Sequence, residues 1–410
     1  MIFRLTSSKY RERSDKVVVY TLTLQYLDFD GSRTGFVTVT RDVEPFVGAV
    51  PISNLEYFPL DRHPSFQVLQ QELIQRGERI LRLQGQHFKE YRGHGLSSDE
   101  MKRFTVSGRI MIDAAGYERL EPVNSIVPRI RNAVDTKSAS AAEKMLLNPI
   151  LYGFSFDDKT WGAFAESSIY DVVWNESAID MLVLPPEKKE FIQVVVKAHG
   201  SGEHAARFDD FIRNKGKGLL GLLAGPPGVG KTMTAEAVAE IAHRPLYMIS
   251  SGELGDTSAS IQSGLSKLMK LSEMWDVVVL LDEADVFLSE RNNVDLSRNA
   301  ITSIFLRHLE YFQGIMMLTT NRVKSLDQAF QSRIHFCLDY PDLTFDARRM
   351  IWSNFIQKAS QDIEVTLQDE DMNKLAQQAL NGRQIKNVVG LCKSVGGVPR
   401  SLPKKNLSMG

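Results

Sequence analysis

The octapeptide GPPGVGKT, at residues 225–232, constrains the fold of this chain more than any other part of the sequence. It fits the pattern G-x-x-x-x-G-K-[ST], and it lies between the aliphatic run LLGLLA and the helical pattern TAEAVAEIAH. In such a loop the backbone N–H groups curl around phosphate oxygens, and the positive end of the helix dipole adds to the attraction. We therefore expect a phosphate-binding loop made by Gly225, Pro226, Pro227, Gly228, Val229, Gly230, Lys231 and Thr232.

Four side chains have expected roles toward ATP and Mg²⁺. Lys231 should reach the β and γ phosphates, and Thr232 should bind the metal. Asp282, which ends the run VVVLL, should reach the magnesium through its water ligands, and Glu283 should polarise the attacking water. An acidic pair at the end of a strand is by itself more often a solvated cluster. The phosphate-binding loop is what favours the catalytic interpretation.

Short aliphatic runs alternate with helical patterns from Leu219 onward, and they predict an α/β domain. Because these runs are continuously apolar, they indicate strands buried on both faces, as in a parallel sheet sandwiched by helices. The expected strands are LLGLLAG, PLYMISS, VVVLLDE, IMMLTTN and IHFCLDY. We assign residues 205–340 to this nucleotide-binding domain, residues 341–394 to a small helical lid and residues 395–410 to a flexible tail.

The first 130 residues predict an α+β domain that selects a partner. Residues 17–42 are rich in β-branched and aromatic side chains, and Asp30-Gly31 opens a polar connection typical of a hairpin. PISNLEYFPL and MKRFTVSGRIMID are read as further strands, and PSFQVLQQELIQRGERILRL as a helix. Residues 131–204 are expected to form a linker, beginning at NAVDTKSASAAEK, and a connecting segment that packs on the ATPase domain.

The letters D-E-A-D in LLDEADVFLSERN raise the alternative of an RNA helicase. A helicase of that type needs a second RecA-like domain after the motif, but most of the 125 residues that follow Asp285 are already assigned to other elements. Its phosphate loop also has the form A-x-T-G-S-G-K-T, which differs from GPPGVGKT. The helicase interpretation therefore fails on architecture.

The ordered motifs resemble those of the AAA+ ATPase family, over residues of about 205–392. After GPPGVGKT and LLDEAD come LTTNR, LDQAFQSR and NGRQIKN. The resemblance implies that Asn321 is the polar residue called sensor 1, and that Arg333 is an arginine finger entering a neighbouring subunit's ATP site. It also implies that Arg383 is a sensor 2 residue above the γ phosphate. Each residue also has a simpler interpretation when taken alone. Asn321 fits a turn at the end of a strand, Arg333 fits a surface charge, and Arg383 fits the first turn of a helix.

The chain is also similar, over nearly its whole length, to a branch of fungal AAA+ proteins with an uncharacterised N-terminal domain. The phrases that carry this similarity include FVGAVPISNLEYFPL, FTVSGRIMID, GFSFDDKTWGAF and FQSRIHF. Compared with that branch, the N-terminal domain and the lid are expected to be shortened. The loop SSGELGDTSASI lacks the aromatic residue with which AAA+ proteins that thread polypeptides grip their substrate, and Leu254 is its largest apolar residue. Threading is therefore not expected.

Composition limits the partners and the compartment. Forty-nine Lys and Arg residues balance fifty Asp and Glu residues, for a formal net charge of −1, which weighs against nucleic acid. The two cysteines, Cys337 and Cys392, lie far apart in the sequence, which favours a reducing, intracellular compartment. The cytoplasm is the first expectation. The alternative is the mitochondrion, if the N-terminal residues are a presequence. No apolar run approaches the roughly 18 residues that a membrane-spanning helix requires.

These observations together predict a magnesium-dependent AAA+ ATPase, oligomeric with a hexamer left open, that remodels an unknown protein partner. The main alternative is an interaction module that binds ATP and hydrolyses little of it. A P-loop helicase or nucleic-acid translocase is the third interpretation. Turnover measurement separates the first two interpretations, and salt-dependent oligonucleotide binding would be needed to support the third. Size measurement with and without ATP is the most informative single experiment, because an arginine finger requires a neighbouring subunit.

Overall fold

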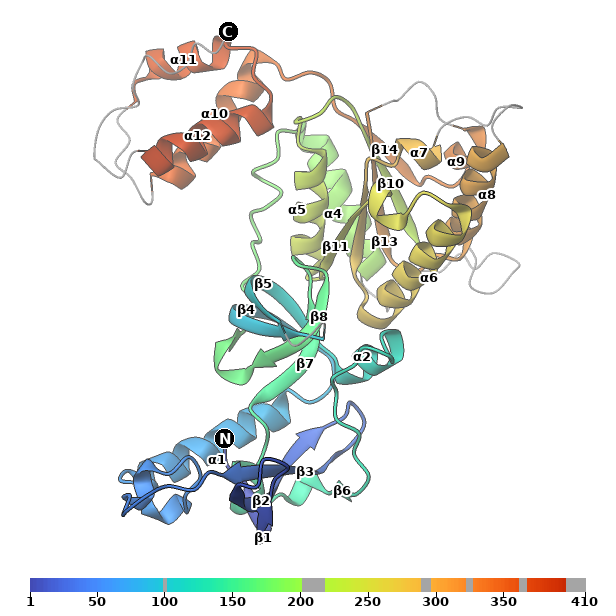
Figure 1. Cartoon of the computed structure of the whole chain (residues 1–410). Helices are drawn as coiled ribbons and strands as arrows, with labels where there is room; N and C mark the ends of the chain where they lie inside the picture. Colours follow the sequence, from blue (N-terminus) through green and yellow to red (C-terminus); the bar gives the residue numbers. More distant parts are fainter. Residues whose placement is uncertain (99–101, 201–217, 289–295, 322–326, 361–366, 396–410) are drawn as a thin grey trace. The chain divides into compact units, whose positions relative to one another are not determined.

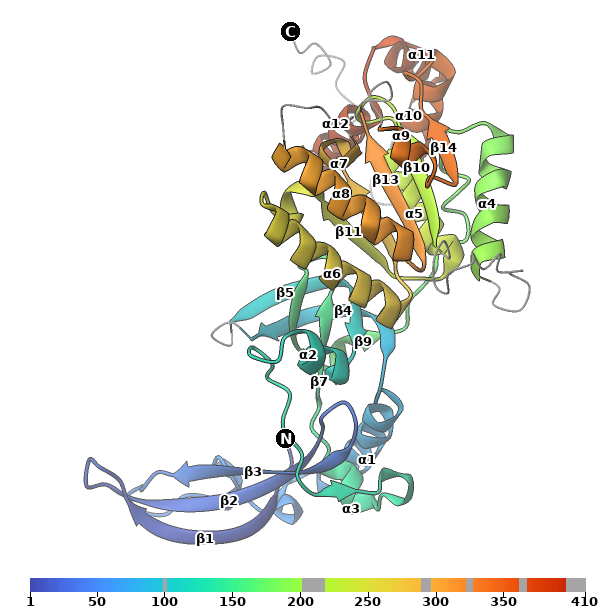
Figure 2. The same ribbon diagram turned by 90° about the vertical axis from the view of Figure 1, so that its right-hand side faces the viewer.

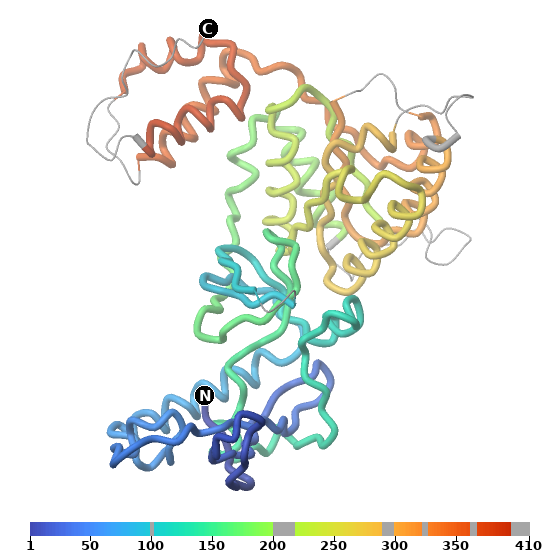
Figure 3. The backbone as a smooth tube through the Cα atoms, in the orientation of Figure 1, coloured from blue at the N-terminus to red at the C-terminus, as the bar shows by residue number. Residues whose placement is uncertain are grey.

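A computed structural model of the chain describes residues 1–98, 102–200, 218–288, 296–321, 327–360 and 367–395 (Figure 1). The tail expected at residues 395–410 thus lies almost wholly outside the described residues. The chain divides into two compact units, Met1–Val173 and Trp174–Gly410. Figure 3 follows the same path as a backbone tube. None of the helices in the described ranges combines the length and the apolar composition that crossing a bilayer requires.

The N-terminal unit begins with an antiparallel sheet in the order β1-β2-β3-β6. The strands span Arg4–Glu12 (β1), Val18–Phe29 (β2), Thr34–Val43 (β3) and Ala133–Val134 (β6). β2 and β3 form the expected hairpin, in which the carboxylate of Asp30 accepts hydrogen bonds from the backbone N–H groups of Ser32 and Arg33. Gly31 adopts a φ of 96°, which the turn requires and glycine adopts without steric cost.

The second sheet of this unit closes on itself. Its strands span His87–Ser97 (β4), Arg103–Ile112 (β5), Ile150–Ser155 (β7), Thr160–Ala165 (β8) and Ile169–Tyr170 (β9). Antiparallel pairing runs from β4 to β5, to β7, to β8 and back to β4, and β9 pairs with β4. Strands approach closely in such a small ring, and a Cβ on Gly153 would lie 2.2 Å from the carbonyl oxygen of Met111.

This closed sheet moves the domain boundary. The sequence interpretation ended the N-terminal domain at residue 130 and assigned residues 131–204 to a linker and connecting segment, whereas the structure's N-terminal unit extends to Val173. The reason is that β7 and β8 complete a sheet begun by β4 and β5, a pairing between segments distant in sequence. The expected linker contains β6, the 3-10 helix η3 (Thr136–Ser138) and helix α3 (Ala141–Met145), which packs on α1 (Phe66–Arg82).

One predicted strand is wrong. PISNLEYFPL contains the 3-10 helix η1 (Ile52–Asn54), and η2 (Leu60–Arg62) begins at its last residue. Pro51 and Pro59 immediately precede these two turns, and proline donates no backbone N–H to a sheet. The unit is completed by α2 (Ala114–Leu120), which is capped by Asp113, and by the 3-10 helix η4 (Glu166–Ser168).

The C-terminal unit contains the predicted parallel sheet, in the order β11-β12-β13-β10-β14. The strands span Leu219–Ala224 (β10), Leu246–Ser250 (β11), Val278–Asp282 (β12), Ile315–Thr320 (β13) and Phe336–Asp339 (β14). Helices α4 (Pro186–Gly200) and α5 (Lys231–Ala242) lie on one face, and α6 (Ser258–Trp275) and α8 (Leu296–Tyr311) lie on the other (Figures 1 and 2). The expected sandwich of helices around a parallel sheet is confirmed.

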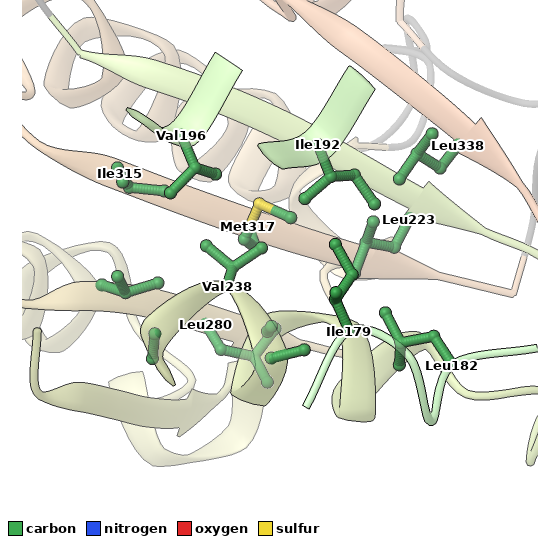
Figure 4. Close-up of a cluster of buried hydrophobic side chains, with 14 of the residues drawn as sticks. Ile179, Leu182, Ile192, Val196, Leu223, Val238, Leu280, Ile315, Met317 and Leu338 are labelled. Atoms are coloured by element: carbon green, nitrogen blue, oxygen red, sulfur yellow. The ribbon is translucent and has the colours of Figure 1, made fainter. Parts of the chain in front are cut away.

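Apolar side chains from both layers meet between the sheet and the first pair of helices (Figure 4). Ile192 and Val196 of α4 and Val238 of α5 pack against Leu223, Leu280 and Met317 of the strands. These six side chains are at most 2% exposed. Every residue of β10 and β13 is buried, so these two strands can present exposed polar groups only beyond their ends.

Three helices form the lid: α10 (Phe345–Ala359), α11 (Asp369–Gln377) and α12 (Gly382–Val395). They pack around the buried side chains Trp352, Leu375 and Ile385, one from each helix. The short elements η5 (Ser251–Leu254), α7 (Asp285–Leu288) and α9 (Gln328–Gln331) complete the unit.

Candidate nucleotide site

The predicted phosphate-binding loop connects β10 to α5 at the carboxyl edge of the sheet. Gly225, Gly228 and Gly230 all have positive φ angles, of 150°, 77° and 109°. At Gly225 the chain also passes so close to β14 that a Cβ would lie 2.3 Å from the carbonyl oxygen of Tyr340. The glycines therefore permit a backbone path that residues with side chains rarely adopt, and α5 begins directly after it at Lys231.

Lys231 lies at the centre of this loop and is 8% exposed. Its ammonium group donates to the carbonyl oxygens of Gly225 and Pro226, at 2.7 and 2.8 Å, and to Oδ1 of Asn321 at 2.8 Å. An ammonium has three N–H donors, so these three bonds account for all of them. The loop lysine and the predicted sensor 1 residue, 90 positions apart, thus contact each other directly.

Three other charged groups of the site, Asp282, Asp285 and Arg383, act on the ammonium group of Lys231. Burial lowers the pKa of Lys231 from its ordinary value, and the positive charge of Arg383 lowers it further. The carboxylates of Asp282 and Asp285 oppose this shift by favouring the ammonium form. One acidic group at the end of β12, a second at the start of α7 and one basic group from the lid therefore lie within electrostatic reach of Lys231.

The acidic pair occupies the turn that follows β12. Asp282 is partly buried, and its Oδ1 accepts a hydrogen bond from the hydroxyl group of Thr319. Glu283 is exposed and has a φ of 55°, a left-handed conformation that costs a residue with a side chain about 1–2 kcal/mol. Its backbone N–H donates to Oγ1 of Thr319 at 3.0 Å, and the N–H of Ala284 donates to the Thr319 carbonyl oxygen at 2.9 Å.

The order of the strands explains why these groups meet. β13 lies between β12 and β10, so the acidic pair, Asn321 and the phosphate-binding loop follow the carboxyl ends of three adjacent strands. In open parallel sheets this edge is where ligands bind. The backbone supports the arrangement, because the N–H of Gly225 donates to the carbonyl oxygen of Thr320 at 3.1 Å.

Sequence reasoning missed two threonines at this edge. Thr319 and Thr320 are each 1% exposed, and their hydroxyl groups donate to Asp282 and Asp285 respectively. Threonine is a common strand residue, so the pair in IMMLTTN was read only as the end of a strand. Two adjacent hydroxyl residues directly before Asn321 were the available signal.

The lid touches the phosphate-binding loop at the start of α12. The N–H of Gly382 donates to the carbonyl oxygen of Gly228 at 2.8 Å, and the side chain of Asn381 accepts from the N–H of Gln384 at 2.9 Å. Arg383 is exposed, one residue after this contact. The lid is thus joined to the nucleotide edge through its N-terminal turn.

Arg333 does not join the chain's own site. It follows α9, and its guanidinium group pairs with the carboxylate of Glu310 on α8 and donates to the carbonyl oxygen of Ala329 at 2.8 Å. Its side chain is 28% exposed. Among the described residues, the guanidinium group of Arg333 is thus held by α8 and α9.

The residues present fit a magnesium-bound nucleotide. The loop offers a buried ammonium group and a helix N-terminus, a setting suited to phosphate. Thr232, the second residue of α5, and Asp282 are both partly exposed and supply the oxygen ligands that Mg²⁺ prefers.

Comparison with known proteins agrees with this geometry. Residues 221–341 match the family described as ATPase family associated with various cellular activities (AAA), and residues 1–64 match a domain of unknown function (DUF7025). The chain is 34% identical over 190 residues, 43% of its length, to "ATPase family AAA domain-containing protein FIGL1" of Arabidopsis thaliana. It is 30% identical over 217 residues, 48% of its length, to "Probable spastin homolog spas-1" of Caenorhabditis briggsae.

These matches cover 27% and 38% of the two relatives, so the chain spans well under half the length of each. A solved structure, that of the FIGL-1 AAA domain in complex with ADP, matches 53% of this chain and 72% of its own, with 21% identity. The TM-score of this match is 0.41. On the family match, the motifs and the parallel sheet, residues 221–341 are a domain of the AAA ATPase family.

Proposed function

We propose that this chain binds and hydrolyses ATP with Mg²⁺ at the edge formed by β10, β12 and β13, and that it uses the turnover to remodel a protein partner. The observation that carries the proposal is the bond between Lys231 and Asn321 beside the acidic turn. The bond joins a loop lysine to a strand-end amide, and the carboxylates of Asp282 and Asp285 act electrostatically on the same lysine.

Each group has a role that suits its position. Lys231 exchanges its carbonyl and amide acceptors for phosphate oxygens, which bind an ammonium more strongly because they are charged. Glu283 is exposed, so it can accept a proton from water and orient it for attack. Thr232 would hold Mg²⁺ directly and Asp282 would hold it through its water ligands, and the bound metal would supply positive charge beside the phosphates. Asn321 and Arg383 contact the γ phosphate from the sheet and from the lid.

Partner remodelling is proposed to use a surface other than the loop after β11. Leu254, the largest apolar residue of that loop, is 3% exposed and packs near Gly264 of α6. The loop therefore presents no bulky apolar group with which to grip an extended chain. The N-terminal unit is the remaining candidate for partner selection. Both cysteines are free thiols, which suits an intracellular compartment.

One observation favours the alternative of a module that binds ATP and hydrolyses little of it. Arg333 is the proposed finger for a neighbouring subunit, yet Glu310 pairs with its guanidinium group in this conformation. A finger held in this way cannot stabilise the transferred phosphoryl group of another subunit. Hydrolysis then requires assembly that releases the arginine from Glu310.

Phosphate release with ATP and magnesium tests the proposal, and Glu283→Gln is the decisive variant. The amide keeps the shape of the carboxylate but cannot take a proton, so we expect ATP to bind with near wild-type affinity while turnover falls at least about a hundredfold. Wild-type turnover in Glu283→Gln would remove Glu283 from the mechanism. Tight ATP binding by a wild-type chain that releases no phosphate would favour the alternative.

A further inference from the structure

We propose that Thr319 is a positioning residue, whose single hydroxyl group fixes both the metal-binding carboxylate of Asp282 and the backbone of Glu283. The inference rests on the proposed function, because it concerns how the same site is held in shape. Thr319 is the penultimate residue of β13 and is 1% exposed, so water cannot replace its hydrogen bonds.

The hydroxyl group connects two parts of the acidic turn. Its hydrogen is donated to Oδ1 of Asp282, and its oxygen accepts the backbone N–H of Glu283 at 3.0 Å. Donating to a carboxylate leaves the lone pairs of the oxygen for the N–H, so the two bonds are compatible at one atom. The bond fixes the direction of one carboxylate oxygen of Asp282, and the second oxygen is left to serve the metal.

The conformation of Glu283 shows why the second bond matters. Its φ of 55° is unfavourable for a residue with a side chain and persists only where neighbouring groups enforce it. Thr319 supplies two such groups, the hydroxyl oxygen for the N–H of Glu283 and the carbonyl oxygen for the N–H of Ala284 at 2.9 Å. The direction in which the Glu283 side chain leaves the turn is therefore set from β13.

Threonine suits this task better than serine because its branched Cβ restricts the χ1 angle. In Thr319→Val the shape and the branching are kept and only the hydroxyl is lost. In Thr319→Ser the hydroxyl is kept. Thr302, on α8, provides the matched control, since it is also 1% exposed and its hydroxyl has no hydrogen-bond partner among the described residues.

The experiment compares the full-length wild type with Thr319→Val, Thr319→Ser and Thr302→Val. Affinity for a fluorescent ATP analogue is measured with EDTA and across a magnesium chloride titration, and phosphate release gives kcat and KM. Groups that orient metal ligands typically change metal affinity or activity by about 10–100-fold. We expect Thr319→Val to raise the magnesium half-saturation about tenfold and to lower kcat by about 10–100-fold, with metal-free binding unchanged. Thr319→Ser should stay within about threefold of the wild type.

The possible failures are distinguishable. If Thr319→Val matches Thr302→Val in both magnesium dependence and kcat, the positioning role is wrong while the ATPase proposal stands. If Thr319→Val loses metal-free nucleotide binding as well, the hydroxyl supports the fold rather than the turn, and the inference is also overturned. If the wild type shows no magnesium-dependent nucleotide binding, the proposed function fails and the inference fails with it.

Discussion

Lys231 shows most directly how one side chain connects separate segments at the carboxyl edge of the parallel sheet. Its three hydrogen bonds hold the ends of β10 and β13 to the phosphate-binding loop before any phosphate arrives. We expect Lys231→Ala to abolish detectable ATP binding, because no other cation of the described loop can replace it. The melting temperature should change little, since the apolar core below the loop is untouched. Isothermal titration with ATP, beside a thermal melt, checks both statements.

Asp28 is a second residue whose environment has a measurable effect, here on the pH dependence of stability. It is 3% exposed in β2, and its carboxylate accepts from the side-chain amide of Asn148 at 2.7 Å and from the hydroxyl of Tyr152 at 3.1 Å. Burial is the largest effect on this group and raises the pKa of Asp28 to about 6, against the hydrogen bonds, which lower it. The folded state therefore holds a proton there more strongly than the unfolded state does.

The sign of the pH dependence follows from that difference. A carboxyl group with a raised folded-state pKa stabilises the fold less as the pH rises through the interval between its unfolded and folded values, here from about 4 to about 6. Between pH 5 and pH 7.5 the wild type should lose about 1 kcal/mol more unfolding free energy than Asp28→Asn. Hydrogen exchange of the β2 and β7 amides, corrected for intrinsic rates, measures this. Asp61→Asn, at an exposed position, controls for the loss of one carboxylate.

The joint between the lid and the phosphate-binding loop depends on one glycine. Gly228 has a φ of 77°, and a Cβ there would lie 2.7 Å from the side chain of Asn381. We expect Gly228→Ala to push the start of α12 away from the loop, to cost about 1–2 kcal/mol of stability and to weaken ATP binding. Faster hydrogen exchange in the first turn of α12 reports the displacement.

Two further variants separate the effect of backbone strain at residue 228 from the steric clash between its Cβ and Asn381. Gly390 lies in α12 with open space around its Cβ position, so Gly390→Ala should leave ATP affinity unchanged and raise helix stability by up to about 1 kcal/mol. Asn381→Ser in the Gly228→Ala background shortens the obstructing side chain and keeps a good helix cap. This double variant should restore part of the protection of α12 against hydrogen exchange. Full protection in Gly228→Ala alone would show that the lid does not rest on this loop.

Assembly is tested through Arg333, because its role requires another copy of the chain. An arginine supplied by a neighbour typically accelerates phosphoryl transfer about 10³–10⁵-fold. Arg333→Ala should therefore keep ATP affinity nearly unchanged while turnover falls severely. Mixed with Lys231→Ala, it should recover some turnover, since an intact loop from one subunit can meet an intact arginine from the other.

Arg129→Ala is the matched control for this experiment. Arg129 is 86% exposed and pairs only distantly with Glu118, at 3.8 Å. This variant should hydrolyse ATP normally. A mixture of Arg333→Ala and Lys231→Ala that assembles to native size and stays inactive would show that Arg333 is not a finger. Normal turnover by Arg333→Ala alone would show the same.

Local patterns in the sequence were enough to predict the parallel sheet, the phosphate-binding loop and the lid helices. Each of these depends on a short stretch, such as an aliphatic run flanked by glycine or a helical repeat of apolar residues, and short stretches carry their own physical signal. The glycines and Lys231 of residues 225–232 could be assigned to phosphate for the same reason. The strand predicted for PISNLEYFPL was wrong because its prolines, which donate no backbone N–H to a sheet, precede 3-10 turns despite the strand-like composition of the segment.

Pairings between distant segments were decided only by the tertiary structure. The closed sheet of β4, β5, β7 and β8 joins residues more than 60 positions apart, and it moved the unit boundary from residue 130 to Val173. The bonds from Thr319 to Asp282 and from Lys231 to Asn321 span 37 and 90 positions. No local pattern encodes such contacts, because they exist only once buried strands have been ordered beside one another and their polar ends brought to one edge.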